Sequence, residues 1–167
     1  MSPAAYAAEF TATFPGAVTA LVAPDGRYSI DNVDYDNKVP HHVLLLVFIK
    51  TKQQVRLYPY NRHVDVSWAP DSRHLFINDF AGSDNADCII YNVLTKKLVS
   101  VASILHKNKF ANSLMNDNGH VYVTCSNWIA NKGVDVQISG YGTHSPNGFS
   151  DAYKYIFGGE PDLIKSK

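Results

Sequence analysis

The sequence predicts an all-β protein, and three observations lead to this prediction. Stretches in which apolar and polar residues alternate, such as residues 64–68, are typical of half-buried strands. Turn-forming residues follow these stretches, and the turn aspartates Asp25, Asp71 and Asp117 are evenly spaced, 46 residues apart. A constant period of about 40 to 50 residues built from short strands is typical of propeller repeats. We therefore expect three four-stranded, antiparallel, propeller-like blades that form an incomplete or open propeller.

The elements follow one another as a single domain of 167 residues. Residues 1–15 form an N-terminal extension, in which residues 10–14 alternate like an edge strand that ends at Pro15-Gly16. Repeat 1 is expected at residues 17–62, repeat 2 at 63–110 and repeat 3 at 111–158, and a tail at 159–167 is expected to fray. The expected strands are 18–22, 28–33, 42–50 and 54–58 in repeat 1; 64–68, 74–80, 87–94 and 98–104 in repeat 2; and 113–115, 120–125, 134–140 and 152–157 in repeat 3.

The composition argues against two classes of partner. The 15 Lys and Arg residues balance the 15 Asp and Glu residues, so net charge provides no attraction to nucleic acid or to an anionic membrane. The longest apolar run, residues 43–49, is far shorter than the roughly 20 residues of a membrane-spanning helix. We expect neither a nucleic-acid partner nor membrane insertion. The N-terminus shows no signal peptide, although a chain that begins after a removed signal would look the same.

One turn motif resembles a known repeat. Residues 68–73, Trp-Ala-Pro-Asp-Ser-Arg, precede an apolar strand and resemble the blade signature of TolB-type β-propeller repeats, and residues 24–27, Pro-Asp-Gly-Arg, match its turn. The resemblance covers residues 17–157 as three blades. Repeat 1 lacks the aromatic residue, repeat 2 has Ser72 in place of glycine, and repeat 3 keeps only Asp117 with a shifted Gly119. Together with a composition rich in Asn and Tyr, the resemblance favours a periplasmic or secreted bacterial protein.

The number of blades raises the question of closure. Propellers typically close with 4 to 8 blades, so three blades leave exposed edges and faces. The chain could curl into a distorted sandwich, use residues 1–15 as a cover, or self-associate as a homodimer that completes a propeller. A closed barrel is the simpler alternative.

The spacing of the cysteines and histidines does not match a metal site. Cys88 and Cys125 each lie mid-strand among apolar neighbours, where a free buried thiol is the commoner outcome and a disulfide the alternative. No Cys/His spacing typical of zinc is present. His41 and His42 are adjacent on a strand, so their side chains point to opposite faces. We expect no metal and no cofactor.

The loops suggest a binding surface. In a propeller blade, the loop between the second and third strands lies at the same end as the link to the next blade, which would gather residues 34–38, 79–85 and 126–132. Tyr, Trp and Arg commonly anchor interfaces because they bury large areas and keep a polar group. The alternative is that the aromatic residues cap the core. The predicted partner-binding residues are Asp34, Tyr35, Asp36, Tyr58, Tyr60, Arg62, Asp79, Phe80, Asp84, Asn127 and Trp128. The loop at 143–148 is expected at the opposite end.

We interpret the chain as a non-enzymatic protein-binding module, with no catalytic residue assigned. An inhibitor or immunity-type protein that blocks a toxin or an enzyme would suit a small chain of this kind. Two alternatives remain. The first is a hydrolase that uses the loop residues Asp79 and Asp84, since a carboxylate pair can perform acid–base hydrolysis when its two pKa values differ. The second is a scaffold in which several copies complete a propeller.

Overall fold

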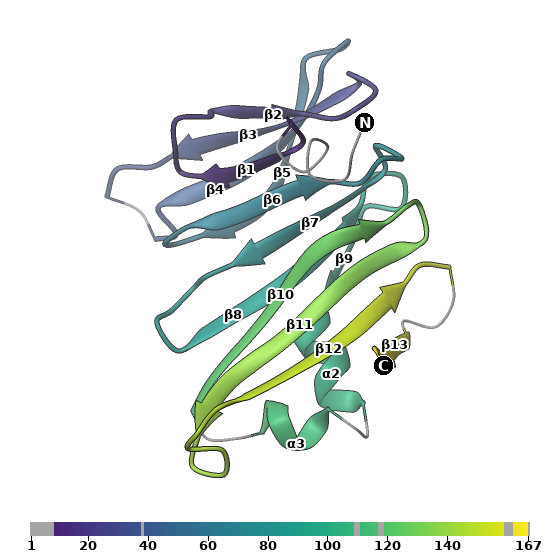
Figure 1. The fold of residues 1–167 in the computed structure, drawn as a ribbon. Coiled ribbons are helices and arrows are strands. Elements are labelled where there is room, and N and C mark those ends of the chain that lie inside the picture. Colours follow the sequence, from purple (N-terminus) through teal and green to yellow (C-terminus); the bar gives the residue numbers. More distant parts are fainter. Residues whose placement is uncertain (1–8, 38, 109–110, 117–118, 159–161, 167) are drawn as a thin grey trace.

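The structure is a computed structural model that describes residues 9–37, 39–108, 111–116, 119–158 and 162–166. Strands dominate these residues and form two sheets. A four-stranded sheet is blade 1, and a nine-stranded sheet contains blades 2 and 3, which hydrogen bonds join; short helices lie beside blade 3 (Figure 1). No barrel closes within the described residues, because the sheets have free edges. The predicted fold class, an open set of propeller-like blades, is confirmed.

Blade 1 is a separate antiparallel sheet. Its strands are β2 (Ala20–Val22), β3 (Tyr28–Asp34), β4 (His42–Phe48) and β5 (Gln53–Tyr60), in the order β2-β3-β4-β5. They correspond closely to the strands expected for repeat 1. The sheet forms because β4 is rich in Val and Leu, which pack well on a pleated surface.

Blade 2 follows the same plan. Its strands are β6 (Val64–Trp68), β7 (His74–Asp79), β8 (Asn85–Asn92) and β9 (Lys97–Ser100). The N-terminal strand β1 (Thr11–Phe14) pairs with β6, which confirms the predicted edge strand. The predicted strand at 98–104 is wrong in its second half, where helix α2 (Val101–Lys107) begins. Ser100 caps this helix by accepting a hydrogen bond from the backbone N–H of Ser103, which ends the strand.

The turns of blades 1 and 2 are equivalent in structure as well as in spacing. In each, the backbone N–H three residues after an alanine closes the turn: Gly26 donates to Ala23, and Ser72 donates to Ala69. Both closing residues have positive φ, 72° at Gly26 and 56° at Ser72. Ser72 therefore adopts the left-handed conformation for which this position otherwise uses glycine. Its hydroxyl accepts a hydrogen bond from the Asp25 N–H, which joins the two turns.

Blade 3 differs from the prediction by one strand. Its strands are β10 (Gly119–Ile129), β11 (Gly133–Gly142), β12 (Phe149–Ile156) and β13 (Asp162–Lys165). The predicted first strand at 113–115 is wrong, since helix α3 (Asn112–Met115) occupies it. The predicted fraying tail is wrong at 162–165, where β13 pairs with β12. The third turn aspartate, Asp117, lies outside the described residues.

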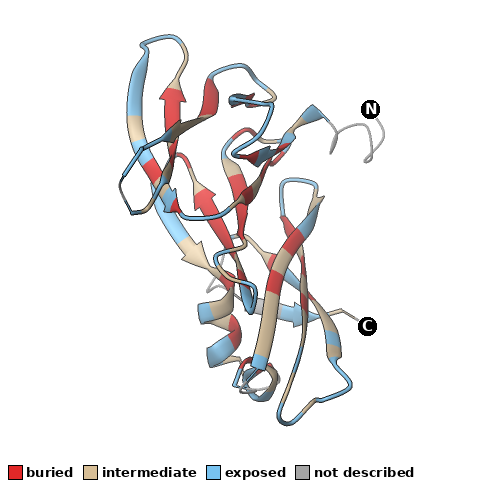
Figure 2. Ribbon diagram, turned by 90° about the vertical axis from the view of Figure 1, so that its left-hand side faces the viewer, coloured by how far each residue is buried: buried red, intermediate tan, exposed pale blue. Residues whose placement is uncertain are grey.

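Two apolar cores lie between the blades. Figure 2 shows buried positions concentrated on the strands and exposed positions on the connecting loops. Blade 2 contributes to both cores because alternate residues of β8 face opposite sides: Ile89 and Tyr91 pack toward blade 1, and Cys88 and Ile90 pack toward blade 3. Residues of α2 and α3, including Leu105 and Met115, complete the second core. The helices thus fill part of the space between blades 2 and 3.

Covalent and polar links join blades 2 and 3. Cys88 and Cys125 form a disulfide with a Cα–Cα distance of 5.7 Å, so the expectation of free thiols is wrong. The Asn78 amide donates to the Cys125 carbonyl and accepts from its N–H, at 2.9 and 2.8 Å. At its start, β10 also pairs in parallel with β8 through Val121 and Tyr122.

Among the described residues, no helix is long and apolar enough to span a membrane.

Candidate functional site

Most of the predicted binding residues lie at one end of the blades. Strands β3, β5, β7 and β11 end there, and β4, β6, β8, β10 and β12 begin there, because neighbours within each blade are antiparallel. The connecting loops are residues 35–41, 61–63, 80–84 and 143–148, and we call this side of the molecule the loop end. It lies on the left of Figure 1.

The third repeat does not contribute the loop that we predicted. Asn127 and Trp128 lie at the far end of β10, opposite the loop end, because β10 is the first strand of blade 3 and not the second. The Trp128 ring packs on Phe76, and its Nε1 donates to Ser67 Oγ at 3.0 Å, so it caps the core. For the same reason the 143–148 loop lies at the loop end, contrary to the prediction.

In blade 1, the loop end holds a polar network. The Tyr60 hydroxyl donates to Asn32 Oδ1 at 2.5 Å, and its ring stacks on His42 with centroids 4.9 Å apart. His42 Nδ1 lies 2.7 Å from Asp34 Oδ1. Hydrogen bonds from His42 and then Asn32 hold the pKa of Asp34 below its usual value. Tyr60 is buried, so it supports the loop and does not itself present a contact surface.

Exposed groups surround this network. Tyr35 is partly exposed, and together with Asp34, Asp36 and His41 it lines a shallow hollow of about 580 Å³. At the junction with blade 2, the His63 ring stacks on Phe80 with centroids 4.6 Å apart. The Phe80 N–H donates to the His63 carbonyl, which fixes the start of the β7–β8 loop. Arg62 lies in the adjacent link between β5 and β6 and is exposed.

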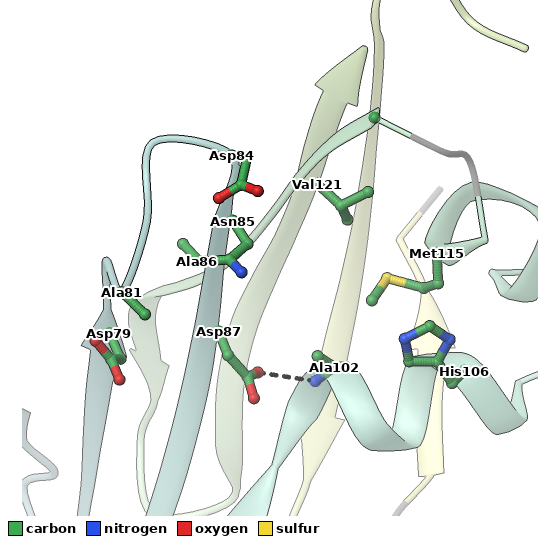
Figure 3. A pocket seen from close by; sticks show the side chains of 11 residues that line it. Asp79, Ala81, Asp84, Asn85, Ala86, Asp87, Ala102, His106, Met115 and Val121 are labelled. Atoms are coloured by element: carbon green, nitrogen blue, oxygen red, sulfur yellow. Dashed lines mark hydrogen bonds between the residues drawn. The ribbon is translucent and has the colours of Figure 1, made fainter. Parts of the chain in front are cut away.

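A deeper hollow, the acidic pocket, lies between blade 2 and the start of blade 3 (Figure 3). Its volume is about 380 Å³. Three aspartates, a histidine and several small apolar side chains line it. The lining residues are Asp79, Ala81, Asp84, Asn85, Ala86, Asp87, Ala102, His106, Met115, Gly119 and Val121.

Two of these aspartates face each other. Asp79 on β7 and Asp87 on β8 are paired across the strands, which places both side chains on the same face of the blade. Asp87 accepts hydrogen bonds from Ser100 Oγ at 2.5 Å and from the Ala102 N–H at 2.9 Å, the latter drawn in Figure 3. Asp79 Oδ2 accepts from the Tyr58 hydroxyl at 2.8 Å. Asp79 Oδ1 is buried and has no partner among the described residues.

Burial raises the pKa of both carboxyls. For Asp79, the hydrogen bond from Tyr58 and the nearby His63 offset part of this effect. For Asp87, the hydrogen bonds from Ser100 and from backbone N–H groups offset it, whereas the charge of Asp79 adds to it. The site therefore holds two carboxylates whose ionised forms are disfavoured by their surroundings.

Asp79 and Asp84 belong to the predicted site, whereas Asp87 and Met115 do not. The link at 106–110 was expected on the same surface, but His106 was not assigned to the site. The expected strands 74–80 and 87–94 already formed a hairpin, and pairing them across its loop would have placed Asp87 within one residue of the position opposite Asp79. His106 and Met115 reach the pocket from α2 and α3, whose helical state was not predicted. Within the described residues, no group of three or more His, Cys, Asp or Glu side chains could hold a metal ion.

We expect Asp79→Asn to stabilise the free protein by about 1 kcal/mol at pH 7, because it removes a charge that burial disfavours and that faces the charge of Asp87. The amide oxygen can still accept the Tyr58 hydrogen bond. Because the pKa of Asp79 is raised in the folded state, ionisation of Asp79 destabilises the wild type. This destabilisation is absent below the usual Asp pKa of about 3.9 and grows as the pH rises through the folded-state pKa. Urea denaturation at pH 4 to 7 should show that the variant's advantage in free energy of unfolding over the wild type increases with pH.

Asp84→Asn is the matched control for this prediction. Asp84 lines the same pocket but is exposed, so its substitution should change the free energy of unfolding by less than about 0.5 kcal/mol at every pH. Equal gains in both variants would show that net charge, and not the Asp79–Asp87 pair, limits stability. A loss of stability in Asp79→Asn would show that the Asp79 charge is already compensated.

Comparisons with known proteins agree with the fold. No protein-family profile and no curated protein matches the sequence. Among solved structures, the β-propeller domain of the Trilobed protease from Pyrococcus furiosus, which has an open velcro topology, matches with a TM-score of 0.55 and 13% sequence identity. The match covers 89% of this chain and 43% of that chain, so this chain spans less than half of the structure that it matches. The likeness shows a propeller-like fold with an open topology.

Proposed function

We propose that this chain is a non-enzymatic protein-binding module that contacts its partner with the loop end of blades 1 and 2. The observation that carries the proposal is the acidic pocket, in which a buried carboxylate oxygen of Asp79 has no hydrogen-bond partner among the described residues. Native proteins rarely leave such a group unsatisfied, and the binding of a ligand is one way in which it can be satisfied. Partly exposed Tyr35 and exposed Asp84 lie at the same end of the blades and fit an aromatic anchor and a polar rim.

The finer form of the proposal is an inhibitor or immunity-type protein that blocks an enzyme or a toxin. The rigid support of the loop end favours it, because preorganised loops lose little entropy on binding. Hydrogen bonds fix Tyr60 and Asp34 in blade 1, and the disulfide fixes blade 3 against blade 2. We also propose that the repeats are of the TolB type, which the equivalent turns at Asp25 and Asp71 support.

The disulfide supports a periplasmic or secreted location. Disulfides persist in oxidising compartments and are rare in the reducing cytosol. Cys88 and Cys125 are both buried, and each lies on a strand of the second core.

Complex formation with a protein from the native host tests the proposal. We expect one partner in fixed stoichiometry by size exclusion with light scattering, and at least tenfold weaker binding for Tyr35→Ala and for Asp84→Lys. Leu94→Ala is the matched control, since Leu94 is exposed at the opposite end of blade 2 and its loss should leave affinity unchanged. Equal weakening by Leu94→Ala would contradict the proposed surface. A dimer of twice 18.5 kDa that captures no partner would favour a propeller completed by two copies.

A hydrolase is the second candidate. It is favoured by one observation: Asp79 and Asp84 line the same pocket, and burial raises the pKa of Asp79, as expected for a general acid. Hydrolysis of a sugar or peptide substrate that is lost in Asp79→Asn, with the fold intact, would support this candidate and contradict the binding module.

A further inference from the structure

We propose that the acidic pocket binds a cationic side chain, and that an arginine guanidinium is its best ligand. This inference rests on the proposed function, since a partner protein would present the side chain. It adds which kind of side chain on the partner the pocket would bind.

The first argument is the unsatisfied oxygen. The Asp79 residue is only 9% exposed, and its Oδ1 has no hydrogen-bond partner in the described part of the chain. A buried acceptor without a donor destabilises the folded state, whereas a charged donor would form a strong hydrogen bond with it. Oδ1 itself has almost no accessible surface, so a ligand in the pocket that Asp79 lines would supply that donor once the carboxyl group turns toward it.

The second argument is the charge of the pocket. Asp79 and Asp87 face each other across β7 and β8, and Asp84 adds a third carboxylate at the exposed side. The described lining residues include no lysine and no arginine, and His106 is the lining side chain that can become cationic. A cation would therefore relieve the repulsion between the facing pair, whereas an anion would increase it.

The third argument is the shape of the ligand. Ala81, Ala86, Ala102, Met115 and Val121 supply apolar wall, and Figure 3 shows Met115 and Val121 across the pocket from Asp79. A basic side chain has an aliphatic stem that such a wall would bury and a charged head that the carboxylates would bind. A volume of about 380 Å³ is within the range of small-ligand pockets.

Guanidinium fits better than ammonium for two reasons. Asp79 Oδ1 has no partner in the described part of the chain, and Ser100 and Ala102 hold Asp87, so the acceptors have fixed directions. The planar guanidinium has five donors in a rigid fork and stays charged when buried. A metal ion is a poorer fit, since the described residues contain no cluster of three or more metal-ligating side chains.

Titration of the ¹⁵N-labelled full chain with L-argininamide tests the inference. We expect saturable shifts of the Ala86 and Ala102 amides, because both residues line the pocket and the Ala102 N–H donates to Asp87. L-citrullinamide, which is similar in shape but lacks the guanidinium charge, should cause none. L-lysinamide should bind more weakly than L-argininamide. Asp79→Asn should lower the affinity at least tenfold, while Asp36→Asn, a matched loss of charge in blade 1, should leave it unchanged.

Several outcomes would overturn the inference. Equal shifts with L-citrullinamide, or equal loss of affinity in Asp36→Asn, would mean that the pocket does not recognise the cationic head. Folding of Asp79→Asn is checked by the dispersion of its own spectrum. If a partner complex depends on Tyr35 and Asp84 but is unchanged in Asp79→Asn, the cation site is wrong and the proposed function stands. If L-argininamide binds but no protein partner exists, the cation site stands and the proposed function is wrong.

Discussion

Replacing Trp68 with alanine should lower the free energy of unfolding by about 3–5 kcal/mol. The side chain is fully buried between blades 1 and 2. Its ring stacks on Tyr28 with centroids 6.3 Å apart, and its Nε1 donates to the Leu21 carbonyl at 3.0 Å. Alanine would leave a cavity at the junction of the two blades and remove the hydrogen bond that joins Trp68 to β2.

Urea denaturation of the purified chain measures this effect, and two variants separate its causes. Trp68→Phe keeps most of the apolar volume but loses the hydrogen bond to Leu21, so we expect its free energy of unfolding to fall by about 1–3 kcal/mol. Trp128→Ala is the control, because Trp128 is only partly buried at the edge of the second core. A smaller loss for Trp68→Ala than for Trp128→Ala would contradict the view that the blade 1–blade 2 junction depends on Trp68.

The correctly predicted features are those that local sequence determines. The turns at Asp25 and Asp71 are closed by hydrogen bonds within a few residues, and the aspartate side chains accept from the N–H groups of Arg27 and Arg73. Such turns depend on side chains that lie next to one another in the chain. The strands of blades 1 and 2 are short runs rich in β-branched, aliphatic and aromatic residues, and turn residues bound them, so their positions could be predicted from the sequence alone.

The errors in blade 3 have a tertiary origin. Leu114 and Met115 read as a short strand before Asp117, but Met115 packs in the second core as part of a helix. A segment of three or four residues contains too little periodicity to distinguish a strand from a helical turn. Counting this segment as a strand displaced every later loop of blade 3 to the wrong end. Trp128 was therefore assigned to the loop end, where it does not lie.

The candidate site was predicted only in part, because some of its contacts are local in sequence and others join distant segments. Asp79 and Asp84 belong to one hairpin and could be grouped from the sequence. It could not be predicted that Asp79 Oδ1 has no partner among the described residues, since Tyr58 of blade 1 binds the other oxygen. Likewise, Asp87 owes its fixed position to Ser100 and Ala102, which are distant in sequence and meet it only after α2 forms.

Removal of the disulfide should have an effect comparable to that of Trp68→Ala. Cys88 and Cys125 are separated by 37 residues, and the loop-entropy relation predicts that cross-linking a loop of this length stabilises the folded state by about 4 kcal/mol. The double variant Cys88→Ala/Cys125→Ala should lose about this amount in urea denaturation. The wild type with a thiol reductant should lose a similar amount, whereas the reductant should not affect the double variant.

The expected loss has a structural consequence for the acidic pocket. The segment closed by the disulfide contains α2 and α3, which provide Ala102, His106 and Met115 to the pocket wall. The bond also holds β10, which provides Val121, against blade 2. If the disulfide maintains the pocket, the reduced protein should bind L-argininamide more weakly even under conditions where it remains folded. An unchanged unfolding transition with the reductant, once thiol titration confirms that the bond is broken, would contradict the prediction, because the Asn78–Cys125 hydrogen bonds and the second core would then suffice to hold blades 2 and 3 together.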